Sequence, residues 1–397
     1  MKNVSGQGEV KELMERITPD YYDKFTCIAD KCPITCCQEW KIAVDADTNR
    51  RWKKIMPPED VAEQKKNLSA YTTHKDGTRV IGLDENQQCP FLSDDKLCRL
   101  VCTYGDKVLS QTCTVFPREV HKFDNHEEAT LVPCCPAVID LWKEKADFPI
   151  NNSQIKPEKE SLLFSIRENI IEMVQNTEQP VEDALLQSFY IMLELYNGES
   201  SEDLVQEYFS EDTLKQLQEA IFKVELPELD TFEECNELLL DISENYRKEG
   251  LYKKYLDPVT SLAEQISEEY DENEMIDKWT AFKKELAQYD QLIRNFLANE
   301  MFSDLVMPDG DLQQTVIRMQ WIAMEYTVIR QSIFLKWMQD GCGKIEHETV
   351  RDYIVVITRM TGYDEEDIYD YLSNSFKTLE WDWGYFALIV GKNEKDR

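Results

Sequence analysis

The chain has 397 residues, of which 44 are Lys or Arg and 77 are Asp or Glu, so its formal net charge is −33. At about 100 to 200 residues per domain this length predicts two or three domains, and 42% hydrophobic residues can fill packed cores. The composition excludes a wholly disordered chain. The negative charge repels phosphate backbones, so we expect no nucleic-acid partner.

Charge and cysteine content both change near residue 150. Residues 1–150 hold 21 basic and 25 acidic residues, whereas residues 151–397 hold 23 and 52. Ten of the twelve cysteines lie between Cys27 and Cys135. We therefore predict a cysteine-rich metal-binding module over residues 1–150 and an acidic all-helical domain over residues 151–397.

The sequence contains no recognisable membrane or export segment. The start, MKNVSGQGEV, lacks the apolar region of a signal peptide, and no apolar run approaches the roughly 20 residues of a spanning helix. We expect a soluble, cytoplasmic protein with no membrane partner. In a reducing compartment, closely spaced cysteines indicate metal ligands rather than disulfides.

The first 150 residues predict short elements and loops, because prolines interrupt them repeatedly. Strands are expected at Lys41–Asp45 and, after the Asp76-Gly77 turn, at Arg79–Leu83. Neither can build a sizeable sheet. A region so rich in loops needs covalent or metal cross-links, and its cysteines can supply them through a metal.

Beyond a polar stretch at residues 147–156, apolar residues recur at helical spacing. The predicted helices cover residues 162–174, 185–196, 204–224, 232–249, 273–298, 312–337, 347–360 and 364–376, with breaks at Pro227, Pro258, Pro308 and residues 341–343. The predicted fold class is mainly α, with a small loop-rich cysteine module joined to a larger irregular helical domain.

Three groups of cysteines mark the first part of the chain. The first runs CIADKCPITCC from Cys27 to Cys37; the others are Cys89, Cys98, Cys102 and Cys113, and then Cys134 and Cys135. Clustered thiolates bind soft and borderline metals. An iron-sulfur cluster is favoured over zinc, because the chain lacks the C-x2-C pairs common in zinc sites. Free or redox-paired thiols are a third possibility, and Cys235 and Cys342 are expected to be buried structural residues.

These segments resemble the flagellin lysine-N-methylase family. The resemblance rests first on the run from Phe25 to Val44, which includes Trp40. It continues in the same order through Cys89-Pro90-Phe91-Leu92, Leu97-Cys98, Gly105, Leu109-Ser110, Thr112-Cys113, Phe116-Pro117-Arg118 and Cys135-Pro136. It covers about 110 residues closely. The order of several segments is specific, although any one of them alone would be weak.

The resemblance implies an enzyme that methylates flagellin lysines with S-adenosylmethionine and carries a cysteine-bound iron-sulfur cluster, most simply 4Fe-4S, with zinc as the second choice. The matching metal ligands are Cys27, Cys32, Cys36, Cys37, Cys89, Cys98, Cys113 and Cys135. Eight thiols exceed the four that one cubane needs, so either two clusters form or several thiols are structural. Cys102 and Cys134 depart from the pattern, as does Glu39, where the family often has glycine.

The sequence names no catalytic residue and no site for the methyl donor. There is no G-x-G-x-x-G motif and no CxxxCxxC signature. His121 or His126 can supply one nitrogen ligand, Trp40 is expected to cap the metal site, and Arg118 and Asp45 have either structural or site roles. The acidic and aromatic residues of the helical part suit a lysine-binding cleft but equally form an ordinary surface and core.

The predicted function is therefore protein-lysine N-methyltransfer to flagellin. The main alternative is a non-enzymatic iron-sulfur or zinc module for redox sensing or interaction, which the missing donor motif favours. A scaffold whose acidic surface recruits a basic partner is the third reading.

Overall fold

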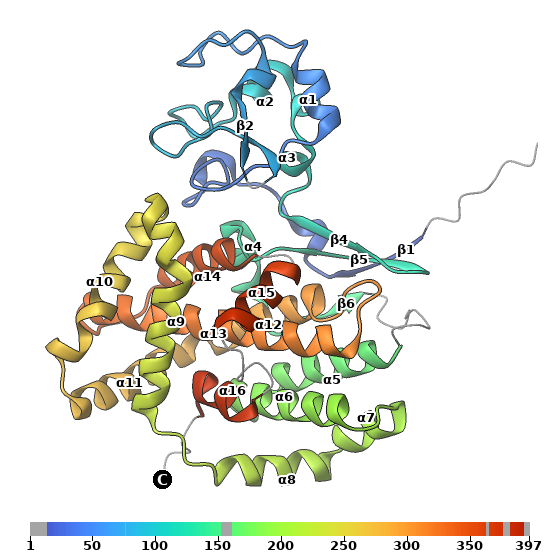
Figure 1. Ribbon diagram of the computed structural model, residues 1–397, viewed down its shortest axis with the longest axis vertical. Helices are drawn as coiled ribbons and strands as arrows, with labels where there is room; N and C mark the ends of the chain where they lie inside the picture. The colour runs from blue at the N-terminus through green and yellow to red at the C-terminus, as the bar shows by residue number, and fades with distance from the viewer. Residues whose placement is uncertain (1–13, 76, 152–160, 363–364, 376–381, 393–397) are drawn as a thin grey trace, which may run out of the picture.

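A computed structural model describes residues 14–75, 77–151, 161–362, 365–375 and 382–392. A small cysteine-rich lobe lies at one end of a larger helical body, with a short sheet at the junction (Figure 1). The prediction of a mainly α fold with a loop-rich cysteine module is confirmed. No helix in these residues is both long enough and apolar enough to cross a bilayer.

The small lobe contains α1 (Ala46–Trp52), α2 (Arg99–Tyr104), α3 (Gln111–Val115) and the hairpin of β2 (Thr72–Lys75) and β3 (Thr78–Ile81). Its own hydrophobic core is built around Trp52, Leu68 and Phe91. The strand predicted over residues 79–83 is thus present as β3. The strand predicted over residues 41–45 is reduced to one isolated bridge, Ala43 to Val80.

The junction sheet has the order β4-β5-β1-β6. Its strands are β1 (Glu15–Pro19), β4 (Arg118–Lys122), β5 (His126–Leu131) and β6 (Ile150–Asn151). β1 pairs in parallel with β5, although the whole small lobe lies between them in the chain. The sequence analysis missed this sheet, because its strands are short, charged and paired across a long separation.

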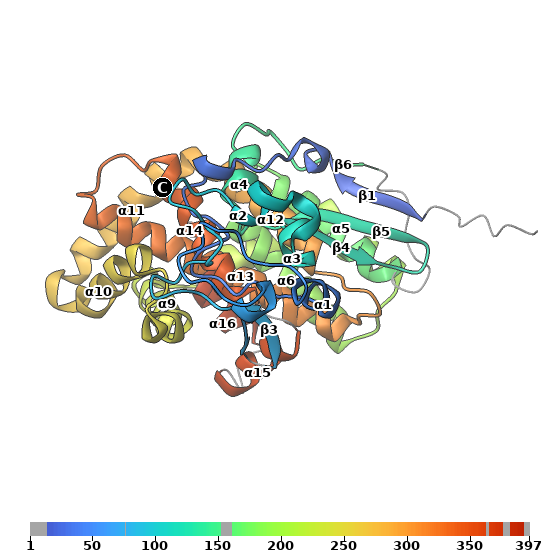
Figure 2. The ribbon, with the colours of Figure 1, turned by 90° about the horizontal axis from the view of Figure 1, so that it is seen from above.

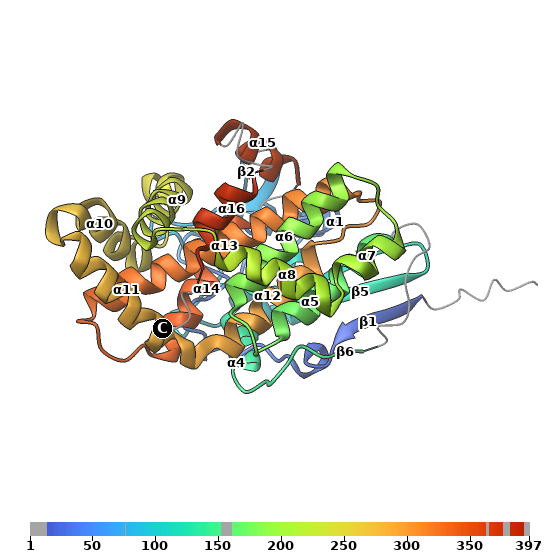
Figure 3. The same cartoon turned by 90° about the horizontal axis from the view of Figure 1, so that it is seen from below.

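The helical body contains α4 (Pro136–Trp142), α5 (Ser161–Gln175), α6 (Val181–Asn197), α7 (Glu202–Tyr208), α8 (Glu211–Phe222), α9 (Glu228–Glu249), α10 (Lys253–Glu269), α11 (Glu272–Leu286), α12 (Asp290–Asp304), α13 (Leu312–Gln339), α14 (His347–Thr361), α15 (Glu365–Ser375) and α16 (Trp383–Val390). Helix α13 crosses the middle of the body (Figures 2 and 3) and is buried along almost its whole length.

Three helix predictions need correction. Residues 204–224 form two helices, because the Ser210 side chain caps α8 by accepting a hydrogen bond from the Thr213 amide. Residues 273–298 are likewise divided, between α11 and α12. The helix break predicted at Pro258 is absent, because this residue lies inside α10. Leu256, Val259 and other apolar residues of this helix are buried at helical spacing.

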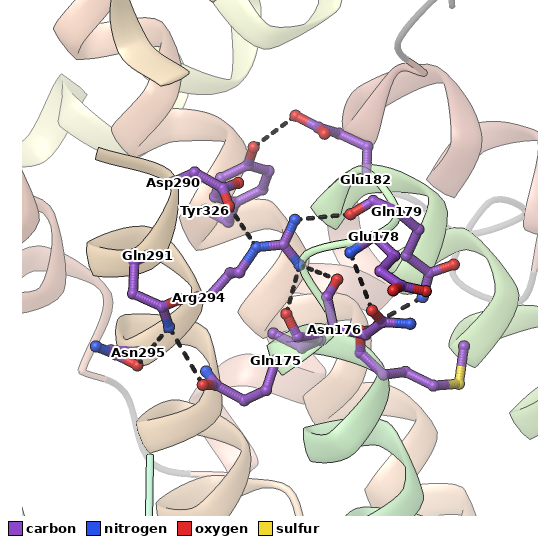
Figure 4. A network of polar contacts seen from close by, with 12 residues as sticks. Gln175, Asn176, Glu178, Gln179, Glu182, Asp290, Gln291, Arg294, Asn295 and Tyr326 are labelled. Carbon is purple, nitrogen blue, oxygen red and sulfur yellow. Dashed lines mark hydrogen bonds and ion pairs between the residues drawn. The ribbon is translucent and has the colours of Figure 1, made fainter. Parts of the chain in front are cut away.

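Helix α12 is fixed to the neighbouring α5–α6 turn by one buried arginine (Figure 4). Arg294 donates hydrogen bonds to the carbonyls of Val174, Asn176 and Gln179 at 2.7, 2.9 and 2.7 Å, and pairs with Asp290. Each carbonyl would otherwise be unsatisfied near the end of a helix. This contact matters for function because α12 carries two of the site residues described below.

The large core includes side chains from both sides of residue 150. Ile17, Leu131 and Trp142 from the first part pack with residues of α5, α6, α12 and α13 in one hydrophobic cluster. The division at residue 150 stays a prediction.

Candidate functional site

A cavity of about 620 Å³ lies where the cysteine-rich part meets the helical body. One wall comes from the segments around Trp40, Phe116 and Cys134, and the other comes from α12, α13 and α14. A concave site of this size between two parts of a protein is a usual place for a ligand. The residues of both walls therefore decide what can bind.

Besides Asp45, four carboxyl groups line this cavity. Glu119 lies on β4, Glu300 and Asp304 lie one turn apart on α12, and Glu325 lies on α13. Glu300 and Glu325 are only 6% and 5% exposed. We call these four residues the carboxylate cluster.

Hydrogen bonds hold the carboxylate cluster in place. Ser303 donates to Glu119 at 3.1 Å, and the Asn299 amide donates to Glu300 at 3.2 Å. Thr361, from the end of α14, donates to Glu325. The carboxyl groups of Glu300 and Glu325 also lie close enough to affect each other's pKa.

Burial and mutual repulsion keep protons on this cluster. Burial raises the pKa of Glu325 to about 7, and burial together with Glu119 raises the pKa of Asp304 to about 7. Burial and the neighbouring Glu325 raise the pKa of Glu300 well above its usual range. Near neutral pH the cluster therefore carries less negative charge than four ionised carboxylates would.

A nearby arginine partly neutralises two members of the carboxylate cluster. Arg318 lies in the cavity wall and its charge lowers the pKa values of Glu119 and Asp304. Among the described residues, the side chains that most affect the pKa values of Glu300 and Glu325 are other carboxyl groups and the neutral donors Asn299 and Thr361.

An aromatic and cationic wall faces the carboxylate cluster. Trp40 packs edge-on against Phe116 with ring centroids 4.9 Å apart, and the Arg359 guanidinium lies 5.2 Å over the Trp40 ring. Trp321 is fixed by its indole N–H, which donates to the Thr361 carbonyl at 3.1 Å. Tryptophan faces attract cations such as ammonium and sulfonium groups.

Arg359 joins this wall to the cysteine loop. It donates to the carbonyls of Ile34, Thr35 and Cys134 at 2.9, 3.2 and 3.1 Å. A hydrogen bond from Cys37 and the charge of Arg359 lower the pKa of the Cys36 thiol to about 7. The cavity and the cysteine region are thus neighbours.

Seven of the eight predicted metal ligands gather around Cys36. Burial raises the pKa values of five of these thiols, and the nearby Cys36 charge raises them further: Cys32, Cys89, Cys98, Cys113 and Cys135. For Cys37 the hydrogen bond with Cys36 is the largest cause of the raised pKa, ahead of burial. Cys27 is exposed and interacts with Cys32. All eight are free thiols, so the structure brings together a donor set suited to a thiophilic metal.

The thiols are more widely spaced than around one tetrahedral zinc ion. Zn–S bonds of about 2.3 Å place sulfurs roughly 4 Å apart. In the described residues no three cysteine sulfurs lie within 4.8 Å of one another. Which thiols bind a metal stays a prediction.

Other predicted residues have definite places. His121 lies beside Glu119 and Asp304 rather than among the cysteines. A ring nitrogen of His121 and one carboxylate oxygen of each acidic residue all lie within 4.8 Å of one another. His126 instead lies 3.5 Å from Glu128. Asp45 caps α1 and accepts hydrogen bonds from Thr48 and Gln111, which gives it a structural role.

Arg118 and Glu39, which adjoin the cysteine segments, also have definite contacts. Arg118 lines it and lies 5.7 and 5.3 Å over the rings of Tyr22 and Phe25, so it is held by aromatic contacts. Glu39 has a φ of +54°, a backbone shape that favours glycine, and its carboxylate accepts a hydrogen bond from the Tyr252 amide at 2.9 Å. Cys235 is fully buried, as predicted.

The sequence analysis missed Glu300, Asp304, Glu325 and the cavity position of Cys134. The helical part has 52 acidic residues, so three of them do not stand out by type. What could have identified two of them is the apolar sequence around them. Glu325 sits in the apolar run WIAMEYTVI, and Glu300 follows NFLAN. A carboxylate within an apolar helical stretch is rarely buried without a partner or a function.

Fold and cavity together define a helical protein with a thiol-rich lobe and an acidic, aromatic-lined site at its junction. A family model described as the FliB lysine N-methylase C-terminal domain matches residues 167–389, more than half of the chain. The chain therefore belongs to this family, as the resemblance in the cysteine segments implied. The helical wall of the cavity lies within the matched residues.

Two curated proteins illustrate the similarity. The chain is 28% identical over 201 residues to the lysine-N-methylase of Salmonella typhimurium, covering 48% of this chain and 45% of that protein. It is 31% identical over 135 residues to the flagellar biosynthetic protein FliU of Salmonella muenchen, covering 32% of this chain and 76% of that protein. The match thus spans less than half of the lysine-N-methylase. No solved structure matches the chain.

Proposed function

We propose that the protein is a lysine N-methyltransferase that transfers a methyl group from S-adenosylmethionine to lysine side chains of flagellin. The observation that carries the proposal is the cavity, whose carboxylate cluster contains a buried pair, Glu300 and Glu325, that interacts mainly with other carboxyl groups and neutral donors among the described residues. A lysine ammonium is a cation of matching charge, and the aromatic wall of Trp40 and Trp321 suits its alkyl chain and a sulfonium donor. Flagellin is proposed from the flagellar and methylase names of the relatives.

We further propose that the cysteine-rich part over residues 1–150 holds an iron-sulfur cluster, with zinc as the second choice. Its ligands would come from the eight predicted thiols between Cys27 and Cys135, and the cluster would cross-link a lobe that has only a small core of its own. The acidic helical part over residues 151–397 would supply most of the lysine-binding wall.

A direct test incubates the full chain, purified without oxygen, with S-adenosylmethionine and flagellin, and weighs the flagellin. We expect a mass gain of whole methyl groups, located on lysines by peptide mapping and absent when the donor is omitted. Flagellin with acetylated lysines is the matched control. If flagellin gains no mass and calorimetry detects no binding of S-adenosylmethionine, the proposal is wrong and the sensing alternative gains support.

Iron and zinc analysis of the same preparation tests the metal proposal separately. Stoichiometric iron with broad visible absorption supports an iron-sulfur cluster. A colourless protein with stoichiometric zinc overturns that part.

A further inference from the structure

The buried pair of Glu300 and Glu325 has the geometry of a proton-transfer site at the cavity wall. The two carboxyl groups come from neighbouring helices and are almost completely buried, and both line the cavity. Thr361 donates to one oxygen of Glu325, and Asn299 donates to Glu300. These donors fix the pair in the wall that Trp321 also lines.

The four carboxylates differ in what neutralises them. Glu119 and Asp304 both interact with the Arg318 guanidinium, and Glu119 is also bound by Ser303. Glu325 interacts with Thr361, Asp304 and Glu300, none of which is a cation. Of the four, Glu325 and Glu300 are therefore the least neutralised by charge, and burial with the neighbouring carboxyl groups favours the protonated form of Glu300.

We propose that Glu325 is the catalytic base that removes the proton from the substrate ammonium, with Glu300 held as its neutral partner. This inference rests on the proposed lysine methylation. A lysine at neutral pH is protonated and has no lone pair with which to attack a methyl group. An enzyme acting on it must take that proton close to the reacting nitrogen.

The step balances as follows. The ε-ammonium gives one proton to the Glu325 carboxylate, which becomes a neutral carboxylic acid. The freed amine lone pair forms a bond to the methyl carbon of the sulfonium donor, while the carbon–sulfur bond breaks and its electron pair stays on sulfur. The products are a methylated ammonium and a neutral thioether, and Glu325 later returns its proton to solvent.

The surroundings of Glu325 give it a suitable proton affinity. Glu300 and Asp304 face it from α12, Thr361 and Arg359 line the cavity from α14, and Arg318 lies on its own helix. Glu119 and Cys134 line the cavity from the first part of the chain, and His121 lies beside Asp304. Because burial raises the pKa of Glu325 to about 7, the group can both accept and release a proton near neutral pH.

The test measures methylation of flagellin from S-adenosylmethionine between pH 6 and 10 by the full wild-type chain and its Glu325→Gln variant. We expect kcat of the variant to fall by about 100-fold or more at pH 7, since general bases contribute ~10²–10⁴. Its rate should then rise about tenfold per pH unit without a plateau, because solvent must deprotonate the amine. The wild-type rate should instead level off above about pH 7.

Two further variants separate a base from a structural role. Glu300→Gln keeps a neutral partner for Glu325, so its rate should still level off with rising pH as the wild-type rate does. Glu325→Asp keeps a carboxylate and should retain a plateau at a lower rate. Glu234→Gln is the matched control, because Glu234 accepts a hydrogen bond from Tyr385 at 2.8 Å outside the cavity.

The outcomes are distinct. If wild type methylates flagellin but Glu325→Gln stays within about threefold of it with the same pH profile, the inference is wrong and the proposed function survives. If wild type produces no methylated flagellin, the proposed function itself fails. Should Glu325→Gln not fold, as judged by circular dichroism, the Glu325→Asp profile decides, and a rate and profile identical to wild type overturn the inference.

Discussion

At the scale of single residues, ionisation of the buried Glu325 carboxyl group destabilises the folded protein. The pKa of Glu325 in the folded protein, about 7, lies above its ordinary value of 4.5, so the folded state binds the proton more tightly than the unfolded state. The stability from this group is present below pH 4.5 and is lost as the pH rises through 7. The shift corresponds to about 3 kcal/mol.

Urea unfolding of wild type and Glu325→Gln at pH values from 5 to 8 measures this effect. The free energy of unfolding of wild type should fall relative to the variant by about 3 kcal/mol across the range. Glu234→Gln should show a constant difference from wild type. Parallel curves for wild type and Glu325→Gln would contradict the raised pKa.

The sequence could predict the residues of the cysteine wall but not those of the acidic wall. Cysteines are rare, so their clustering from Cys27 to Cys135 is informative, and Trp40 and Arg118 were noticed because they adjoin these segments. Glu300 and Glu325 become special only through burial opposite each other on two helices far apart in sequence. Periodicity places each on a helix but does not say which helices pack together.

At the scale of secondary-structure elements, Arg294 holds α12 against the α5–α6 turn (Figure 4). Arg294→Met keeps much of the side-chain volume but leaves three carbonyls without their donor. We expect a loss of about 3 kcal/mol in the free energy of unfolding, measured in urea. Because α12 carries Glu300 and Asp304, methylation should also fall.

The control for Arg294 is Lys336→Met on α13, where the lysine forms a pair with Asp340 at the surface. Such a surface pair contributes under about 1 kcal/mol. Equal losses in the free energy of unfolding for the two variants would show that the contacts of Arg294 stabilise the protein no more than a surface ion pair does.

Sequence periodicity located most helices and misjudged their ends where capping or burial decided them. Ser210 begins α8 inside a run that looked continuous. Pro258 is the sixth residue of α10, so the helix continues despite one lost backbone hydrogen bond, and burial of Leu256 and Val259 on either side stabilises it. The junction sheet was beyond local reasoning, since β1 and β5 pair across more than 100 residues of chain.

At the scale of the whole molecule, Arg359 joins the cysteine loop to the helical body. Its three hydrogen bonds reach carbonyls at Ile34, Thr35 and Cys134, all outside its own helix. Arg359→Met should destabilise the protein by about 3 kcal/mol and speed proteolysis between residues 27 and 45. Arg247→Met, which removes a partly exposed pair with Glu264, should change neither by a comparable amount. Unchanged proteolysis in Arg359→Met would contradict this role.

Removing the proposed metal should affect the two parts of the molecule unequally. The small lobe has a core of few side chains, including Trp52, Leu68 and Phe91, whereas α13 is buried in the large core. A lobe of this size needs cross-links that the thiols would provide through the metal. Hydrogen exchange after chelation should therefore show amides of α1, α2 and β3 losing protection while those of α13 keep theirs.

Cys102→Ser, which changes an exposed cysteine outside the predicted ligands, should leave the pattern of the metal-loaded protein unchanged. Equal protection of the small lobe before and after chelation would mean that its fold does not depend on a metal.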